Sequence, residues 1–339
     1  MDSPLRLGII GYGLAGSAFH APVIAAEPDL AVAAILVGNS ARQIQASERY
    51  PTADVVAELD VFLNLNLDAA VVATPNQTHF ELTDKLLDAD ISVVVDKPMT
   101  TDFREAKHLV EKADRRRLLL CSYQNRRFDG DFLTVQQLLA SGELGSVFRF
   151  ESRFERFRAH VKPGWKEEPG PGAGILWDLG PHLIDQAIAL FGPPVSVYSE
   201  IQKVRLDALV DDSAFVALEH SGGETSHLSM SAVAGSPGPR FRVLGTSGAY
   251  VKHGLDPQED ALRDGGDPSR VGWGRESVSS WGEIHTGQSS RPVPTIPGNY
   301  REFYQQFAAA LRGKGPVPVD PADILRVIQI IEDAHSASA

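Results

Sequence analysis

One short segment constrains the fold of this chain more than any other: Gly11-Tyr12-Gly13-Leu14-Ala15-Gly16. It follows an apolar run, residues 5–10, and opens a segment with helical spacing, residues 15–26. In a G-x-G-x-x-G turn between a strand and a helix, the first glycine permits the tight turn. The second lets a pyrophosphate approach the backbone, and the third packs the helix against the strand. The segment therefore predicts a dinucleotide site at Gly11, Tyr12, Gly13, Leu14 and Ala15, with a plain glycine turn as the alternative.

The first 122 residues alternate short apolar runs with segments of helical spacing. The runs expected to be strands are residues 5–10, 30–37, 69–74, 91–95 and 118–122. The segments expected to be helices are residues 15–26, 41–50, 78–89 and 102–114. Runs that are apolar throughout are typical of strands covered on both faces, and alternating strands and helices predict a parallel, doubly wound sheet. We therefore expect an α/β dinucleotide-binding Rossmann domain over residues 1–122.

Residues 123–339 follow a different pattern. After a helix expected at 129–140, strand-like segments follow one another at 147–157, 195–204, 214–220, 225–232 and 241–244. The last of these and residues 249–253 are joined by GTSG, which predicts a hairpin. Strands that follow strands predict a mostly antiparallel sheet, hence an α+β second domain over residues 123–339. Residues 256–297, rich in Gly, Pro, Ser and charge, are expected to form a loop or lid, and helices are expected at 300–312 and 321–334.

The composition excludes several classes of partner. Asp and Glu number 44 against 32 Lys and Arg, a formal net charge of -12, which argues against nucleic acid or an anionic membrane. Any anionic ligand must therefore be held by local donors. The single cysteine, Cys121, permits no internal disulfide. No apolar stretch approaches the ~18 residues of a membrane span, and the N-terminus lacks the features of a signal peptide. We expect a cytoplasmic protein.

The end of the second expected strand bears on the choice of cofactor. An acid about 20 residues beyond the glycine turn would bind the free 2′-hydroxyl of an NAD ribose. Here the segment contains Asn39, Ser40 and Arg42 instead, and the next acid is Glu48. These three side chains could hold a 2′-phosphate. We therefore expect NADP(H) in preference to NAD(H), although Arg42 could also be an ordinary surface residue.

Two further loops come at the carboxyl ends of expected strands, where ligands bind in open α/β sheets. The first, residues 74–79, offers Thr74, Pro75, Asn76 and His79 to the cofactor. His79 could instead cap or pack locally. The second is Asp96-Lys97-Pro98. A lysine that follows apolar residues and precedes a proline is poorly placed for a solvated surface charge. It is well placed to donate to a carboxamide and a substrate hydroxyl, and a partly desolvated lysine can relay a proton.

A third segment carries potential acid–base chemistry. Residues 170–174, rich in glycine, lead into a sequence in which Asp178, His182 and Asp185 share one helical face. Because Pro181 is tolerated only in the first turn, the helix is expected to begin near Asp178. An imidazole beside carboxylates is a reasonable general base. A buried polar cluster and a metal site remain as alternatives, but no second His or Cys lies at ligand spacing, so no metal is expected.

Together these motifs resemble the Gfo/Idh/MocA family of nicotinamide-dependent sugar and polyol oxidoreductases. The resemblance covers essentially the whole chain and is carried by GYGLAGSAFHAPVI, TPNQTHFE, DKPM and WDLGPHLID, at residues 11–24, 74–81, 96–99 and 177–185. Within the family, AFHAP, CSYQNRRFDGDFL and QEDALR are most similar to NADP-dependent scyllo-inositol 2-dehydrogenases. The resemblance implies a Rossmann domain followed by an open-faced β-sheet that supports homodimers or tetramers.

The resemblance also implies roles for single residues. Lys97 would be the lysine of the family's E-K-P motif, with Asp96 in place of glutamate beside the cofactor. Asp178 and His182 would form the D-x-x-x-H pair. Asn125 and Arg126 would lie near nicotinamide and substrate, while Trp165 and Lys166 would reach the cofactor.

The expected reaction is reversible oxidation of a secondary alcohol, on a cyclic polyol or sugar, to a ketone, with hydride moving to nicotinamide C4. In it, His182 takes the hydroxyl proton, Asp178 orients the substrate or the imidazole, and Lys97 polarises the developing alkoxide. These three residues and Asn125 and Arg126 would bind substrate. A non-catalytic sensor of dinucleotide and sugar is the alternative from another class, and a reductase of non-sugar carbonyls differs only in substrate.

Overall fold

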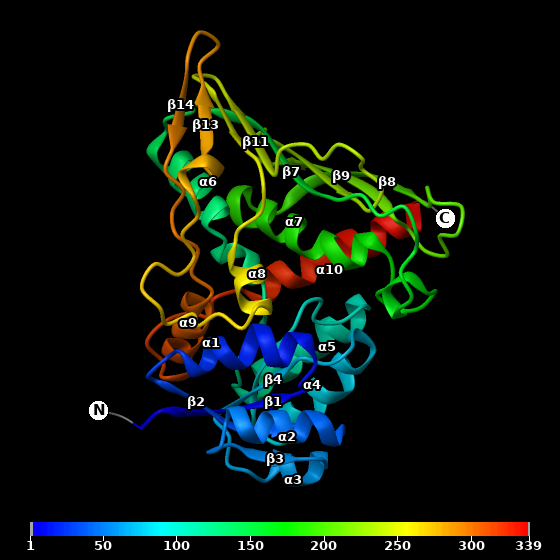
Figure 1. Cartoon of the computed structure of the whole chain (residues 1–339). Coiled ribbons are helices and arrows are strands. Elements are labelled where there is room, and N and C mark those ends of the chain that lie inside the picture. Colours follow the sequence, from blue (N-terminus) through cyan, green and yellow to red (C-terminus); the bar gives the residue numbers. More distant parts are fainter. Residues whose placement is uncertain (1–2, 338–339) are drawn as a thin grey trace. The chain divides into compact units, whose positions relative to one another are not determined.

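The computed structural model describes residues 3–337 (Figure 1). Its contacts divide the chain into two compact units, each assembled from segments far apart in the sequence. The first contains the chain up to Phe128, with Gln258–Trp273 and Asn299–Ile324. The second contains Asp129–Pro257 and Gly274–Gly298, with the chain from Leu325 onward. The boundary after residue 122 that the sequence suggests stays a prediction.

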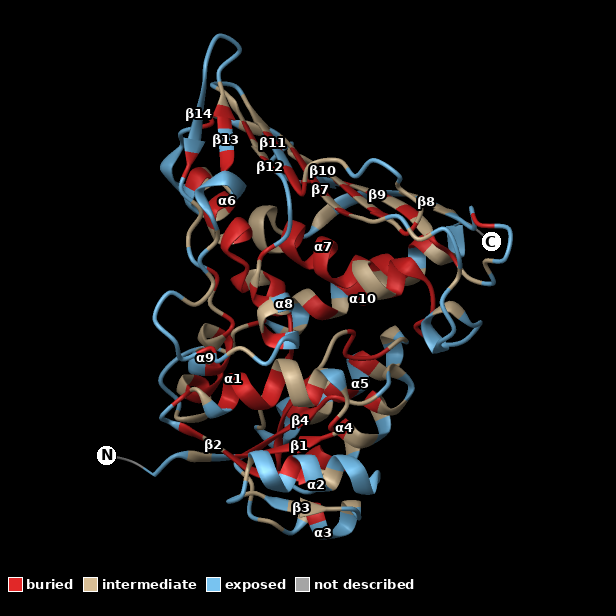
Figure 2. Ribbon diagram, viewed as in Figure 1, coloured by how far each residue is buried: buried red, intermediate tan, exposed pale blue. Residues whose placement is uncertain are grey.

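A six-stranded parallel sheet forms the centre of the first unit. Its strand order is β3-β2-β1-β4-β5-β6, and every neighbouring pair is parallel. The strands are β1 (Leu5–Ile10), β2 (Leu30–Leu36), β3 (Asp54–Val56), β4 (Ala69–Val72), β5 (Ser92–Val95) and β6 (Leu120–Ser122). All residues of β4 and β5 are buried, as expected of strands covered on both faces, and Figure 2 labels β4 at the buried centre of this unit. The predicted parallel, doubly wound sheet is confirmed.

Helices connect these strands. They are α2 (Ser40–Arg49), α3 (Leu59–Leu63), α4 (His79–Asp88) and α5 (Phe103–Arg116), with the 3-10 turns η2 (Asn76–Thr78) and η3 (Asn125–Phe128). The helix expected at 15–26 is instead a π-helix, η1 (Ala15–His20), followed by α1 (Ala21–Ala25). Ala21 donates its N–H to Gly16, five residues back, and Pro22 then has no N–H to donate. The proline therefore fits where the hydrogen-bond register changes.

Segments from later in the chain complete the first unit. They are α8 (Gln258–Arg263), which packs on η1, and α9 (Arg301–Leu311). Gln258 holds this region together. Its side-chain oxygen accepts the N–H of Tyr300 at 2.8 Å and the indole N–H of Trp273 at 3.0 Å, and its amide nitrogen donates to the Phe128 carbonyl at 3.2 Å.

An eight-stranded mixed sheet forms the second unit, in the order β14-β13-β12-β11-β7-β10-β9-β8. Its strands are β7 (Val147–Glu155), β8 (Pro194–Gln202), β9 (Ser213–His220), β10 (Thr225–Ser231), β11 (Phe241–Gly245), β12 (Ala249–Lys252), β13 (Gly282–His285) and β14 (Ser290–Val293). Among these described strands β7 and β10 pair in parallel and the other neighbouring pairs are antiparallel, so the mostly antiparallel sheet is confirmed. The hairpin of β11 and β12 is also as predicted. The expectation of a loop over 256–297 is wrong in part, because α8, β13 and β14 lie within it.

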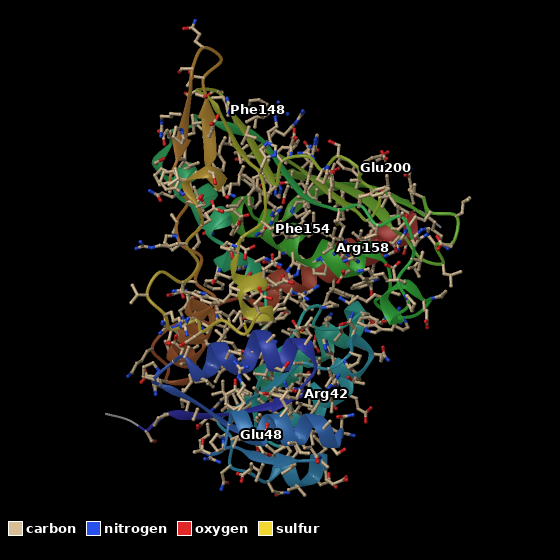
Figure 3. All side chains as sticks on the ribbon, viewed as in Figure 1. Arg42, Glu48, Phe148, Phe154, Arg158 and Glu200 are labelled. Carbon is tan, nitrogen blue, oxygen red and sulfur yellow. The ribbon has the colours of Figure 1, made fainter. Side chains whose placement is uncertain are left out.

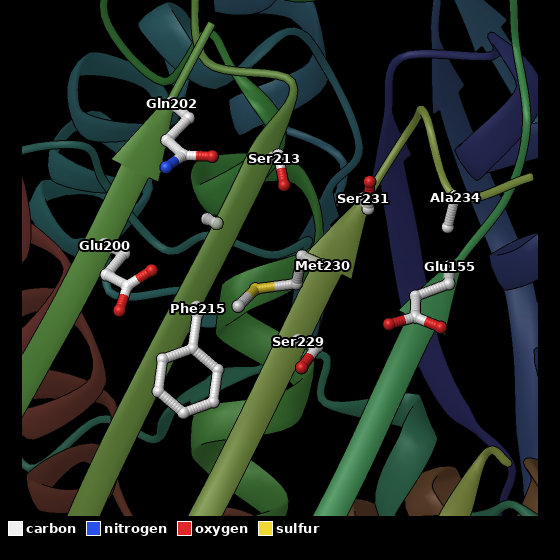
Figure 4. Close-up of a pocket in the computed structure, with 10 residues that line it drawn as sticks. Glu155, Glu200, Gln202, Ser213, Phe215, Ser229, Met230, Ser231 and Ala234 are labelled. Atoms are coloured by element: carbon white, nitrogen blue, oxygen red, sulfur yellow. The ribbon is translucent and has the colours of Figure 1, made fainter. Parts of the chain in front are cut away.

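One face of this sheet is covered and the other is open. The covering helices are α6 (Gly130–Ser141), α7 (Ile175–Phe191) and α10 (Pro321–Ala337). In β9 and β10, Val216 and Leu228 are buried against these helices, while Phe215 and Ser229 alternate with them on the open side. A shallow pocket of about 240 Å³ lies on the open side, with Glu155, Ser229, Phe215 and Glu200 projecting from four adjacent strands (Figure 4).

Within residues 3–337, no helix combines the length and apolar composition that crossing a membrane requires.

Candidate active site

The glycine turn after β1 has the geometry that a bound pyrophosphate needs. Gly11 has a φ of +95°, and a Cβ there would lie 2.6 Å from the Ala73 carbonyl oxygen. A Cβ at Gly16 would overlap the Gly11 carbonyl oxygen. At Gly13, by contrast, the nearest atom to an added Cβ is Nη1 of Arg42, 3.8 Å away. The outer two glycines are thus required by the fold, and the middle one leaves the backbone open to a ligand.

Asn39, Ser40 and Arg42 lie exposed at the end of β2 and the start of α2. Asn39 caps the helix, because its side-chain oxygen accepts the N–H of Arg42 at 3.1 Å. The Arg42 side chain reaches back beside Gly13, whereas Glu48 lies near the other end of the helix (Figure 3). The glycine turn thus has a guanidinium beside it, and the nearest acid of α2 lies at the far end of that helix. This arrangement can accept a phosphate.

His79 connects two loops at the carboxyl edge of the sheet. Its ring is buried, with Nδ1 at 2.8 Å from the Pro98 carbonyl oxygen and Nε2 at 2.8 Å from that of Thr74. Both ring nitrogens are therefore occupied by backbone groups. The structure favours the local role that the sequence left open over contact with the cofactor. Thr74, Pro75 and Asn76 stay at the end of β4, where the sequence predicts them.

Asp96 and Lys97 follow β5 directly and are both half-buried. The Asp96 carboxylate accepts the N–H of Lys97 at 2.8 Å, and the Lys97–Pro98 peptide bond is cis. The lysine therefore belongs to a loop held by its own preceding carboxylate and by His79 through Pro98. It is not a bulk-solvent side chain.

A buried polar cluster in the same unit was not foreseen. A ring nitrogen of His20 lies 2.6 Å from the Tyr304 hydroxyl, and the rings of His20 and Tyr123 are 4.3 Å apart. Complete burial lowers the pKa of His20 to about 4 and raises the pKa of Tyr304 well above its ordinary value. His20 is thus neutral at neutral pH, although the Asp96 carboxylate favours its charged form. A histidine within the apolar AFHAP segment was the signal available in the sequence.

Asn125 and Arg126 are both buried at the carboxyl end of β6. The Arg126 guanidinium pairs with the carboxylate of Glu259, from α8, and donates to the Tyr300 hydroxyl at 3.2 Å. Glu259 also binds Arg263, one turn along the same helix, at 2.6 Å. The QEDALR segment therefore supplies the counter-charge of Arg126, a role its sequence alone did not indicate.

In the second unit, α7 begins three residues earlier than predicted. Its first residue is Ile175, so Pro181 lies in the second turn rather than the first. Asp211 fixes this start, because its carboxylate accepts the N–H of Leu176 at 2.8 Å and its carbonyl oxygen accepts that of Ile175 at 2.9 Å. A cap from a distant residue extends the helix before the proline, which local sequence rules could not predict.

The first turns of α7 carry Asp178 and His182. The Asp178 carboxylate lies 2.5 Å from Nζ of Lys166 and 3.6 Å from Nη2 of Arg156. His182 follows one turn later, with 7% of its surface exposed and its ring edge-on to Phe154. Nζ of Lys166 lies 5.6 Å from the exposed Trp165 ring.

The predicted site residues thus gather in two groups. The carboxyl edge of the parallel sheet holds the glycine turn, Thr74–Asn76, Asp96, Lys97, Asn125 and Arg126. The second unit holds Trp165, Lys166, Asp178 and His182, and Asp185 is buried further along α7. That the two groups meet on one substrate stays a prediction. Among the described side chains, no group of three or more His, Cys, Asp or Glu residues is arranged to hold a metal ion.

A parallel sheet in this strand order, with a glycine turn after its first strand, defines a dinucleotide-binding Rossmann protein. Residues 5–124 match the family model described as the oxidoreductase family with an NAD-binding Rossmann fold, and residues 132–251 match that of the GFO/IDH/MocA C-terminal domain. The chain belongs to the Gfo/Idh/MocA family of NAD(P)-binding oxidoreductases.

Similar proteins align over nearly the whole chain. The oxidoreductase YdgJ of Escherichia coli K12 is 40% identical, over 98% of this chain and 96% of its own. The scyllo-inositol 2-dehydrogenase (NADP+) IolW of Bacillus subtilis is 33% identical, over 98% and 94%. The solved structure of the Bacillus subtilis oxidoreductase yvaA has a TM-score of 0.94 at 32% identity and covers 99% of this chain and 96% of its own.

Proposed function

We propose that the protein is an NADP(H)-dependent dehydrogenase that oxidises a secondary alcohol of a cyclic polyol or sugar to a ketone, reversibly. The observation that carries the proposal is the presence of potential proton-transfer side chains in both units of the chain. A half-buried lysine follows β5 at the nucleotide edge, and an aspartate and a histidine occupy successive turns of α7. The named inositol dehydrogenase among the similar proteins supports the substrate class.

The residues present fit a phosphorylated dinucleotide. Gly13 leaves room for the pyrophosphate, and Arg42 lies beside it with no acid at the end of β2. Because the Asn39 side-chain oxygen is already used as a helix cap, its amide nitrogen and the Ser40 hydroxyl would complete the 2′-phosphate site. Asn125, Trp165 and Lys166 would contact the nicotinamide half. Bound there, the nicotinamide supplies the hydride acceptor.

Three side chains would then perform the proton chemistry. His182 accepts the proton of the substrate hydroxyl, and Asp178 orients the neighbouring hydroxyls or the imidazole. Lys97 stabilises the negative charge that develops on the oxygen. General-base catalysis typically contributes ~10²–10⁴-fold, and preorganised charge stabilisation a similar factor. Arg126, which is paired with Glu259, would contact the substrate.

A panel of substrates tests the proposal. Purified protein with NADP+ is mixed with inositols, aldoses and simple secondary alcohols, and absorbance of the reduced nicotinamide is recorded. We expect turnover with at least one cyclic polyol or sugar and none with acyclic simple alcohols. Silence on every compound, with tight NADPH binding retained, would favour a non-catalytic sensor.

We also propose that copies of the chain associate through the open face of the eight-stranded sheet into homodimers or tetramers. The edge strand β8 supports this, since Tyr198, which donates to Glu200 on the open face, is 58% exposed. Sedimentation velocity should then report an oligomer, and a monomer at micromolar concentration would reject the proposal.

A further inference from the structure

The end of β7 places two arginines along α7. Beyond Glu155 the chain stays extended, with Arg156 and Arg158 donating their N–H groups to the carbonyls of Ser231 and Ala232 at 2.9 and 2.7 Å. Alternate residues of an extended chain project to the same side, so Phe154, Arg156 and Arg158 face one way. Figure 3 labels Phe154 and Arg158 on this segment.

The row formed by Phe154, Arg156 and Arg158 runs beside α7. Phe154 contacts His182, and Arg156 contacts Asp178 one helical turn earlier. Two residues of strand advance ~6.6 Å and one helical turn ~5.4 Å, so the two rows keep nearly in step. Arg158 is therefore placed beyond Asp178, next to the start of α7.

Two cations share the Asp178 carboxylate. Lys166 pairs with it at 2.5 Å and Arg156 at 3.6 Å, and Arg158 lies two residues beyond Arg156 along the chain. The next acid, Glu167, is held by Arg205 at 2.9 Å, and Arg205 also binds Asp212 at 2.8 Å. Arg205 thus engages both of these carboxylates, and among residues 3–337 the Arg158 guanidinium forms no ion pair.

Arg156 itself is short of acceptors. Its Nε is buried and has no hydrogen-bond partner among residues 3–337, while Nη2 forms an ion pair with Asp178 at 3.6 Å and the side chain is 38% exposed. Burial and the neighbouring charge of Arg158 lower the pKa of Arg156, against the opposing effects of Asp178 and Glu167. A guanidinium remains charged nonetheless. Holding two neighbouring guanidinium groups together costs free energy. A bound anion would offset this cost, because guanidinium groups match carboxylates and phosphates in a two-pronged geometry.

We propose that Arg156 and Arg158 bind an anionic group, a carboxylate or a phosphate, on the substrate. The alcohol oxidised at Asp178 and His182 would then belong to a sugar acid or a sugar or polyol phosphate rather than to a neutral ring. The inference rests on the proposed dehydrogenase function and names its substrate class. Lys166 stays paired with Asp178, so that carboxylate does not repel the anion.

Matched pairs of compounds test the inference. NADP+ reduction by the full-length protein is measured with D-glucose against D-glucuronate and D-glucose 6-phosphate, and with myo-inositol against its 1-phosphate. The variants are Arg158→Gln, Arg158→Lys and a control, Arg115→Gln, which removes the same charge from the surface of α5, where Arg115 is 62% exposed.

We expect kcat/KM for an anionic member to exceed that of its neutral partner. Arg158→Gln should lower it by about 10- to 100-fold, the usual effect of losing a charge-assisted hydrogen bond. Arg158→Lys should be intermediate and Arg115→Gln within about twofold of the wild type, as for surface charges. Preference for glucuronate or for the phosphates tells which anion the site takes.

Other outcomes overturn the inference. Equal or better turnover of the neutral compounds, unchanged in Arg158→Gln, rejects it and leaves the proposed function standing. Weaker NADPH binding in Arg158→Gln, with substrate selectivity unchanged, assigns the arginines to the cofactor and rejects it too. If no compound is oxidised, the dehydrogenase proposal fails. In that case, calorimetric titration with glucuronate and glucose 6-phosphate in the presence of NADPH tests the anion site independently of turnover. Binding that is lost in Arg158→Gln supports the anion site, and no binding rejects it.

Discussion

Lys97 lies half-buried after four buried residues of β5, in a loop that Asp96 and His79 hold in place. Replacing it with alanine removes the positive charge but leaves the glycine turn intact. We expect Lys97→Ala to lower kcat by at least ~100-fold, the usual size of one proton-transfer or charge-stabilisation contribution. NADPH affinity, measured by fluorescence, should change little. The exposed Lys85, paired with Glu81 on α4, provides a control in Lys85→Ala. Near-wild-type turnover of Lys97→Ala would remove the lysine from the mechanism.

Arg42 is the residue on which cofactor preference should depend. Its guanidinium lies beside Gly13, and we propose that it binds the 2′-phosphate. We expect the wild type to bind NADPH more tightly than NADH. Arg42→Ala should weaken NADPH binding by about 10-fold while leaving NADH nearly unchanged, because only NADPH loses a charged hydrogen bond. Equal losses for the two cofactors, or tighter NADH binding by the wild type, would contradict this assignment.

His20 should make stability depend on pH. Burial lowers its pKa to about 4 in the folded state, whereas an unfolded histidine titrates near 6.5. As pH falls below 6.5 the unfolded chain takes up the proton first, so the free energy of unfolding decreases until about pH 4. The shift corresponds to roughly 3 kcal/mol. Urea unfolding of the wild type and His20→Gln across this range isolates the residue from His220 and His227, whose pKa values burial also lowers. If the free energy of unfolding changes with pH equally in the two proteins, His20 does not cause the pH dependence.

At the scale of elements, α7 depends on a distant cap. Asp211 accepts the N–H of Leu176, and burial raises the pKa of its carboxyl group despite that hydrogen bond. Asp211→Ala should lower the free energy of unfolding by about 1–2 kcal/mol, as loss of an N-cap does. It should also reduce kcat/KM, because Asp178 lies in the first turn of this helix. Asp211→Asn, which keeps an acceptor, should recover most of both. Unchanged melting of Asp211→Ala would contradict the assignment.

Elements with a strong local pattern could be predicted from the sequence, and those without one could not. The buried strands of the Rossmann sheet and the β11–β12 hairpin follow from apolar runs and turn residues. Strand β3 has three residues, none fully buried, so it leaves no pattern. β13 and β14 lie in a segment rich in glycine and serine and are ordered by pairing, β13 with β12 and β14 with β13. The start of α7 depends on Asp211, 36 residues after Ile175.

Across the whole molecule, the sequence likewise predicts the local motifs of the site but not its long-range contacts. The glycine turn, Asp96–Lys97 and the Asp178–His182 spacing are visible in the sequence because each is a local motif. The pairing of Arg126 with Glu259 joins residues 133 positions apart, and no periodicity reveals it. Arg156 and Arg158 alternate visibly along the chain, but their meaning depends on the helix that β7 faces.

The account depends most on Lys97 and His182, which lie in different units of the chain, acting on one substrate. A double-mutant cycle of Lys97→Met and His182→Gln, read in kcat/KM with NADPH affinity as the check on folding, measures this directly. If both groups stabilise the same transition state, the double variant should be about as slow as the slower single variant. Losses that simply multiply would show that the two residues act independently and would contradict the account.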